Sequence, residues 1–150
     1  MDGFIFRNPV KIIFKEGAVE HLKEEIKPYN RILLVYGGGS IKKTGIYDKV
    51  MKGLEGKSVT ELSGIIPNPE TTKVYEGIEL CRKNDIDFIL AVGGGSVIDS
   101  AKAIAAGAKL DGDFWDELFM KKSDITDAIP LGSVLTMVGT GSEMNSGGVI

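Results

Sequence analysis

Two glycine-rich segments of this 150-residue chain have the composition of phosphate-binding turns. Gly37-Gly38-Gly39-Ser40 follows an apolar run that ends at Tyr36, and Gly93-Gly94-Gly95-Ser96 follows one that ends at Val92. Successive glycines leave a turn without Cβ atoms, so its backbone can adopt positive φ and its N–H groups can approach a phosphate. A single segment of this kind is equally well explained as a tight strand-to-helix turn. Two of them favour phosphate binding.

The two turns differ from the common nucleotide-binding fingerprints. Neither reads G-x-G-x-x-G or G-x-x-x-x-G-K-[ST], so the sequence predicts neither an ordinary Rossmann turn nor a P-loop ATPase. At Ser96 the chain enters a predicted helix, whose N-terminal N–H groups and partial positive charge suit a pyrophosphate. Ser96 and Asp99 have the spacing of a capping box, and Asn68-Pro69 fits the start of an earlier helix.

Strands and helices alternate along the segments that must position these turns. Short apolar runs are separated by stretches in which apolar residues recur every three or four positions, as on one face of a helix. The predicted strands are Lys11–Phe14, Arg31–Tyr36, Val59–Ile65, Phe88–Val92 and Ile129–Thr136, and the predicted helical stripes are Val19/Leu22/Ile26, Ile46/Val50/Leu54, Val74/Ile78/Cys81 and Val97/Ile98/Ala101/Ile104/Ala105.

The two central strands indicate the fold class. Residues 32–35 and 88–92 are continuously apolar, as burial on both faces of a parallel sheet requires. The sequence therefore predicts an α/β fold, a doubly wound parallel sheet. Both glycine turns then fall at the carboxyl edge of the sheet, where such folds bind ligands.

Composition excludes several other classes of protein. The chain has 43% hydrophobic and 26% charged residues and a net charge of −3 from mixed signs, which predicts one globular domain and no nucleic-acid partner. It has no signal-peptide pattern and no run of about 18 apolar residues, so we expect a cytoplasmic protein with no membrane partner. The one cysteine, Cys81, lies on an apolar helix face and is expected to pack in the core rather than act as a nucleophile.

Three longer segments resemble a known family. Residues 93–102, GGGSVIDSAK, together with Pro67-Asn68-Pro69 and Gly139-Thr140-Gly141-Ser142-Glu143, resemble the iron-containing alcohol dehydrogenases. Residues 37–45, GGGSIKKTG, resemble the branch of NADPH-dependent butanol dehydrogenases and broad-range aldehyde reductases. The similarity runs from about Phe4 to Ile150. It implies the Rossmann-like cofactor domain of the dehydroquinate-synthase-like fold, and hydride transfer between a nicotinamide cofactor and a small alcohol or aldehyde such as butanol or butanal.

The resemblance also implies a cofactor-binding role for residues in each loop. Gly94, Gly95 and Ser96 would hold the pyrophosphate, and Asp99 would lie towards the nicotinamide ribose and the substrate. The loop residues implied to contact other parts of the cofactor are Gly37, Gly38, Gly39, Ser40 and Asn68 on the adenosine side, and Thr136, Thr140 and Ser142 near phosphate, ribose or amide groups. Asn145 is similar to a polar position near the family's substrate pocket.

The first glycine turn predicts which dinucleotide is bound. Family members that use NAD place an acidic residue where this sequence has Gly37 or Gly38, because a carboxylate accepts from the ribose 2′-OH and repels a 2′-phosphate. Here no carboxylate is present, and Ser40 can donate to the phosphate, so NADP(H) is predicted. Lys42 or Lys43 would add positive charge, although a solvated helix end explains both lysines equally well.

The resemblance implies that, in this family, one aspartate and three histidines hold iron or zinc, and that the metal acts as a Lewis acid. The chain has one histidine, His21, so we expect no catalytic residue and no metal ligand in residues 1–150. These residues are then a truncated N-terminal dinucleotide-binding domain, inactive alone, whose helical metal-binding domain would follow Ile150; the intact enzyme would be a homodimer.

The acidic cluster of Asp111, Asp113, Asp116 and Glu117 is interpreted as a turn and helix start rather than as a metal site. Asp111-Gly112-Asp113 is typical of a turn that leads into a helix, with Asp116 and Glu117 in its first turn. The neighbouring aromatic residues Phe114, Trp115 and Phe119 are predicted to anchor this segment onto the sheet.

Two alternatives remain open from the sequence. One is an enzyme like glycerol dehydrogenase or dehydroquinate synthase, which shares the architecture and a GGGS-x-x-D turn. The other is a non-catalytic nucleotide-binding or regulatory module. An aspartate followed by His-x-x-x-His and a later histidine, beyond Ile150, would distinguish the enzyme from the module.

Overall fold

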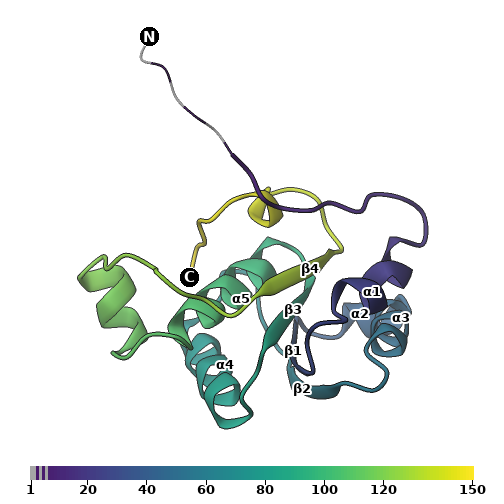
Figure 1. Cartoon of the computed structure of the whole chain (residues 1–150), viewed down its shortest axis with the longest axis horizontal. Helices are drawn as coiled ribbons and strands as arrows, with labels where there is room; N and C mark the ends of the chain where they lie inside the picture. Colours follow the sequence, from purple (N-terminus) through teal and green to yellow (C-terminus); the bar gives the residue numbers. More distant parts are fainter. Residues whose placement is uncertain (1–2, 4, 6) are drawn as a thin grey trace.

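A four-stranded, entirely parallel sheet lies at the centre of the computed structural model, which describes residues 3, 5 and 7–150 (Figure 1). Phe4, where the family resemblance begins, is outside the described residues. The strand order is β2-β1-β3-β4, and the strands are β1 (Arg31–Tyr36), β2 (Ser58–Leu62), β3 (Phe88–Gly93) and β4 (Leu131–Leu135). The predicted doubly wound α/β fold is confirmed.

Helices cover both faces of this sheet (Figure 1). One face carries η1 (Ala18–His21), α1 (Leu22–Glu25), α2 (Ser40–Lys43) and α3 (Ile46–Gly53), and the other carries α4 (Thr71–Lys83) and α5 (Gly95–Gly107). Because side chains alternate along a strand, Leu33 and Ile89 pack under α4 and α5, whereas Leu34 and Leu90 pack under α1 to α3. Within the described residues, no helix has both the length and the apolar character to cross a membrane.

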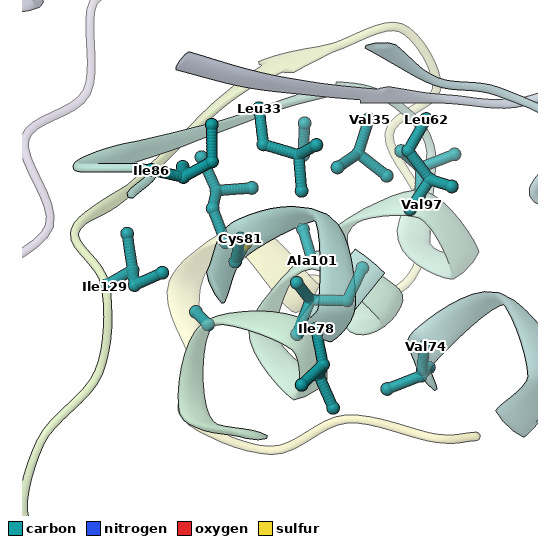
Figure 2. Close-up of a cluster of buried hydrophobic side chains, with 14 of the residues drawn as sticks. Leu33, Val35, Leu62, Val74, Ile78, Cys81, Ile86, Val97, Ala101 and Ile129 are labelled. Atoms are coloured by element: carbon teal, nitrogen blue, oxygen red, sulfur yellow. The ribbon is translucent and has the colours of Figure 1, made fainter. Parts of the chain in front are cut away.

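The core beneath α4 and α5 contains the single cysteine. Figure 2 shows Cys81 among Leu33, Ile86 and Ile129, in a cluster made only of apolar side chains. Burial of the thiol raises the pKa of Cys81 to about 12, because the thiolate loses its hydration there. The side chain is therefore a packing group, as the sequence predicts.

One predicted strand is wrong. Lys11–Phe14 has no regular structure, and its apolar side chains Ile12 and Phe14 are 60% and 96% exposed. A short apolar run is not sufficient for a strand, since a strand also needs a neighbour to accept its backbone hydrogen bonds. The edge strands β2 and β4 do not pair with this segment.

The two predicted helix caps are wrong, although α5 (Gly95–Gly107) begins within one residue of Ser96, as predicted. Asn68 adopts a left-handed conformation with φ of 57°, and α4 begins only at Thr71 after the extended residue Glu70. An N-cap needs an extended backbone, which Asn68 does not have. Helix α5 is capped by Gly94 without a side-chain hydrogen bond, so Ser96 and Asp99 do not form a capping box.

The acidic and aromatic segment leads into a short π-type helix, η2 (Asp116–Met120). Asp113 accepts from the Tyr75 hydroxyl at 2.9 Å and from the Asp116 N–H at 3.0 Å, which confirms a turn. Phe114 is buried in the core cluster that α4 and α5 form with the sheet, while Trp115 and Phe119 stack on each other and are each 37% exposed. Of the three aromatic residues, Phe114 is thus the one buried in this core.

Close contact between α4 and α5 generates the first prediction. A Cβ at Gly77 would lie 2.4 Å from Ile104 Cδ1 and 3.0 Å from Leu62 Cδ2, and neither side chain has room to move because both are buried. Gly77→Ala should lower the free energy of unfolding by up to about 2 kcal/mol, since overpacking costs roughly 1–3 kcal/mol and alanine's helix propensity returns about 1 kcal/mol.

Urea unfolding of Gly77→Ala measures this change. The matched control is Gly139→Ala, where a Cβ would meet nothing within 4 Å. A Gly77→Ala midpoint equal to or above that of the control would contradict the tight contact.

Candidate functional site

Four loops meet at the carboxyl edge of the sheet. The register pairs Tyr36 with Val92 and Gly93 with Leu135, so β1, β3 and β4 end in one row. The loop after β2 is tied to the first glycine turn, because Gly64 and Ile65 donate their N–H groups to the carbonyls of Gly37 and Tyr36 at 3.2 and 3.3 Å. The predicted site residues of all four loops are therefore brought to one edge.

The first turn is open around its middle glycines. A Cβ at Gly38 or Gly39 would meet no atom within 4 Å, and Gly39 has a φ of 101°, a conformation that L side chains rarely adopt. Ser40 is exposed where α2 begins. This turn leaves its backbone accessible to a ligand.

The second turn needs glycine for a different reason. None of Gly93, Gly94 and Gly95 has a positive φ, so that part of the sequence argument is wrong for this turn. A Cβ at Gly93 would lie 2.6 Å from Val97 Cγ2, and one at Gly95 would lie 2.4 Å from Thr140 Oγ1. The glycines therefore permit close packing of the turn against α5 and the loop after β4.

The N-terminus of α5 is the best anion-binding feature of this edge. Within the described residues, the N–H groups of Gly95 and Ser96 have no hydrogen-bond acceptor, and both residues are half-buried. They open a helix of 13 residues, whose dipole adds partial positive charge. A pyrophosphate fits this position by charge and by the N–H groups that it offers.

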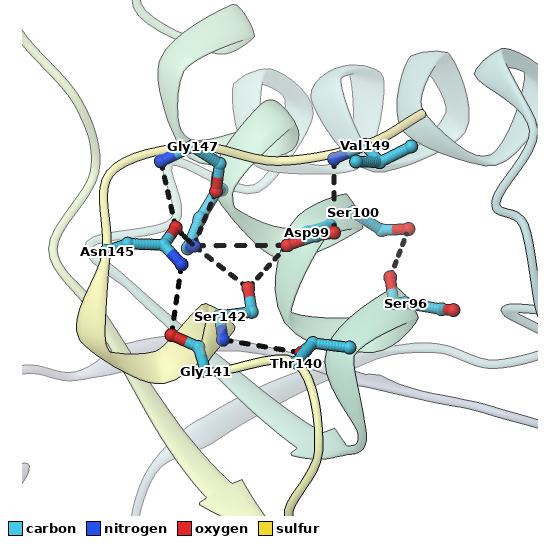
Figure 3. A network of polar contacts seen from close by, with 10 residues as sticks. Ser96, Asp99, Ser100, Thr140, Gly141, Ser142, Asn145, Gly147 and Val149 are labelled. Carbon is cyan, nitrogen blue, oxygen red and sulfur yellow. Dashed lines mark hydrogen bonds and ion pairs between the residues drawn. The ribbon is translucent and has the colours of Figure 1, made fainter.

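Asp99, one turn into α5, faces the segment that follows β4 (Figure 3). Its carboxylate accepts from the Ser142 hydroxyl and, through the other oxygen, from the Val149 N–H at 3.1 Å. Ser142 is 3% exposed, and its hydroxyl also accepts from Lys102. The predicted residues Asp99 and Ser142 thus lie together and bind each other.

Asn145 is held by the same network. Its Oδ1 accepts from Lys102 Nζ at 3.1 Å and from the Gly147 N–H at 3.0 Å, and its Nδ2 donates to the Gly141 carbonyl at 3.0 Å. The side-chain amide is therefore engaged in shaping its own loop. Burial lowers the pKa of Lys102, and the nearby Asp99 carboxylate partly opposes this shift.

The two lysines after the first turn differ in their surroundings. Lys42 Nζ lies 5.3 Å from the ring centre of Tyr36 and 4.6 Å from that of Tyr47. Those two phenols donate to the carboxylate of Glu61 at 2.7 and 2.8 Å, and the Tyr36 bond is the main reason that the pKa of Glu61 is below its usual value. Lys42 is thus held beside aromatic rings, whereas Lys43 is exposed at the end of α2.

Three predicted residues sit on the surface of this edge, and of these only Thr140 joins the network, through its Oγ1, which accepts from the Ser142 N–H at 3.3 Å. Asn68, Thr136 and Thr140 are exposed in the loops after β2 and β4. Sequence reasoning gave no role to Lys102 or to Glu61. The three-residue spacing of Lys102 from Asp99 was a usable signal for the first, but nothing in the sequence pairs Glu61 with two tyrosines.

A metal of the kind that the family resemblance implies does not fit these residues. Within the described part of the chain, no three histidine, cysteine, aspartate or glutamate side chains converge as a metal site would require. His21 lies at the end of η1, on the face of the sheet opposite α5. No step of a reaction is assigned to a metal held by these residues.

The fold and the edge together are those of a Rossmann-like α/β domain, in which a parallel sheet presents glycine turns and a helix N-terminus at one rim. The family model described as "Iron-containing alcohol dehydrogenase" matches residues 9–150. The chain belongs to the iron-containing alcohol dehydrogenase family.

Individual relatives agree with this family. Over its whole length the chain is 57% identical to "Probable NADH-dependent butanol dehydrogenase 1" of Bacillus subtilis, covering 39% of that protein. It is 45% identical to "NADPH-dependent aldehyde reductase YqhD" of Escherichia coli, again covering all of the chain and 39% of the relative. The crystal structure of NADH-dependent butanol dehydrogenase A from Thermotoga maritima superposes with a TM-score of 0.92 at 48% identity, over 97% of this chain and 37% of that one.

The buried hydroxyl of Ser142 generates the second prediction. Ser142→Ala removes the donor to Asp99 and an acceptor for Lys102, which leaves both charged groups under-satisfied in a partly buried place. The free energy of unfolding should fall by about 1–3 kcal/mol. Thermal or urea unfolding measures it, with Ser146→Ala, at an exposed serine of the same segment, as the control. Equal loss in the two variants would refute a special role for Ser142.

Proposed function

We propose that this chain binds NADP(H) at the carboxyl edge of its sheet, as the cofactor-binding half of an oxidoreductase that transfers hydride between NADP(H) and a small alcohol or aldehyde such as butanol or butanal. One observation carries the proposal: the Gly37 turn, the Gly93 turn and the loop after β4 begin side by side in one row of the sheet. A dinucleotide needs such an extended, side-chain-poor rim because its two halves flank a central pyrophosphate.

The pyrophosphate is proposed to lie at Gly94, Gly95 and Ser96. Support comes from the N–H groups of Gly95 and Ser96, which have no acceptor within the described residues. The adenosine half would then extend over the open turn of Gly37 to Ser40 towards Asn68, whose loop is tied to that turn.

The nicotinamide half would extend towards the loop after β4 and Asp99. Thr136 and Thr140 are exposed there and would donate to ribose or amide groups. Ser142 would act indirectly, since its hydroxyl already binds Asp99. Asn145, which belongs to the same network through Lys102, would border the substrate.

The choice of NADP(H) rests on the lack of an available carboxylate, among the described residues, where the adenosine ribose would lie. Gly37 and Gly38 offer none, and both oxygens of Glu61, on the neighbouring strand β2, already accept from phenols. Ser40 and Lys43 are exposed at α2 and would meet a 2′-phosphate. The relatives themselves divide, since the Bacillus subtilis protein is named for NADH and the Escherichia coli protein for NADPH.

The bound cofactor would supply the hydride, and the residues of this chain would bind it, orient it and exclude water from its pyrophosphate. The chain spans 39% of the length of the relatives named above. We propose that the electrophilic metal, iron or zinc, is held by residues of a helical domain other than these 150, that residues 1–150 alone are inactive, and that the intact enzyme is a cytoplasmic homodimer.

The third prediction concerns cofactor preference. NADPH should bind at least about tenfold more tightly than NADH, because one charge-assisted contact to the 2′-phosphate is worth roughly 1.5–3 kcal/mol. Titration of the protein with each reduced cofactor, followed by nicotinamide fluorescence, measures the ratio. Equal affinities would remove the argument from Ser40 and the missing carboxylate, and no binding of either would remove the proposed function.

The fourth prediction distinguishes the two lysines. Lys43→Met should weaken NADPH binding about tenfold and leave NADH binding unchanged, because only NADPH carries the 2′-phosphate. Lys42→Met is the matched variant and should change the ratio less, since Lys42 is held at Tyr36 and Tyr47. A larger loss of NADPH preference in Lys42→Met than in Lys43→Met would reverse the assignment.

A further inference from the structure

Lys102 is an unusually well-bound lysine. Its side chain is 17% exposed, and its ammonium donates to Ser142 Oγ at 2.9 Å, Asn145 Oδ1 at 3.1 Å and the Gly147 carbonyl at 2.6 Å (Figure 3). An ammonium has three donors, so all of them are used. Lysines are mostly exposed, and burial of one is costly unless its charge is matched. Asp99, 3.9 Å away on the same helix, provides that match.

All three acceptors belong to one segment, residues 142–147, which follows β4. Because Lys102 is on α5, its hydrogen bonds fasten this segment to the helix. The segment has little regular structure of its own, with only the short turn η3 (Ser142–Met144). Asn145 braces it from within, through Gly141 and Gly147. Its location therefore depends on Lys102 and on the Asp99 contacts.

The near end of the same segment forms one wall of the second glycine turn. The Ser142 N–H donates to Thr140 Oγ1 at 3.3 Å, and that oxygen lies 2.4 Å from where a Cβ of Gly95 would be. Contacts thus run without a gap from Lys102 through Ser142 and Thr140 to Gly95. A shift of the fastened segment would move this wall.

We propose that Lys102 is a positioning residue for the dinucleotide: its three hydrogen bonds hold residues 140–147 against the first turns of α5 and so fix the wall beside the pyrophosphate and nicotinamide. This inference rests on the proposed function and assigns to it a residue outside the glycine turns. Lys102 also balances the charge of Asp99, which would otherwise repel an anion at the start of the same helix.

The test compares Lys102→Met with the wild type, in the protein as expressed from its complete gene. Without nucleotide, hydrogen exchange of the backbone amides in residues 141–149 should become faster, including that of Val149, which donates to Asp99. With nucleotide, the Kd for NADPH should rise about tenfold or more. The affinity for 2′,5′-ADP should stay within about twofold, because that fragment lacks the nicotinamide half that would lie along this wall.

The ratio of the two affinities separates positioning from general loss of structure. Equal weakening of NADPH and 2′,5′-ADP would overturn the proposal, and so would unchanged exchange of residues 141–149. Lys102→Arg keeps the charge, but its planar guanidinium cannot direct three donors at these acceptors, so only partial recovery is expected. Full recovery of NADPH affinity by arginine while residues 141–149 still exchange faster would show that charge acts without holding the segment, and would also overturn the proposal.

Lys109→Met is the matched control, because Lys109 is a 46% exposed lysine just beyond the end of α5, paired with Asp127. It should leave both the exchange and the affinities unchanged. If the wild type bound neither NADPH nor NADH, the proposed function would fail, and the exchange measurement would still decide whether Lys102 holds the segment.

Discussion

Burial of a parallel sheet on both faces is the constraint on which the rest of this structure depends. Residues 32–35 and 88–92 are apolar throughout because helices cover them from two sides. Parallel pairing then fixes the direction of every strand, so the loops that follow β1, β3 and β4 must all emerge at one edge. The pairing thus brings the loops of the proposed cofactor site to one edge, and hydrogen bonds such as those from Lys102 then fix individual loops there.

Within that arrangement, glycines allow α5 to lie close to its neighbours and so set its position. Glycines make the closest approaches at both ends of the helix: Gly93 against Val97 and Gly95 against Thr140 at its start, and Gly107 against Ile78 at its end. Each approach is too close for a Cβ, so the helix packs nearer to its neighbours than alanine would allow. The N–H groups at its N-terminus are held in place by packing rather than by a capping side chain.

The sequence was sufficient for features that depend on local composition, and it failed where geometry depends on distant partners. Continuous apolar runs predicted β1 and β3 correctly, and two glycine turns predicted the functional edge. Asn68 was misread as a cap, since a left-handed backbone cannot be read from residue type alone. The Lys11–Phe14 strand failed because pairing with a neighbouring strand is not encoded in the segment itself. Lys102 donates to Ser142 and Asn145, which lie 40 and 43 positions further along the chain. No rule of sequence spacing predicts such pairs.

The polar network at this edge is complete before any ligand binds. Within the described residues, no buried side-chain nitrogen or oxygen lacks a hydrogen-bond partner. The hydroxyl proton of Ser142 goes to Asp99, and its lone pair receives Lys102, so the three groups satisfy one another in a chain. A dinucleotide would therefore meet a loop that is already ordered, and less binding free energy would be lost in ordering it. The donors without an acceptor among the described residues are instead the backbone N–H groups of Gly95 and Ser96, which suit an anion. The side chains of this edge are thus already hydrogen-bonded, whereas two backbone N–H groups at the start of α5 remain available to a ligand.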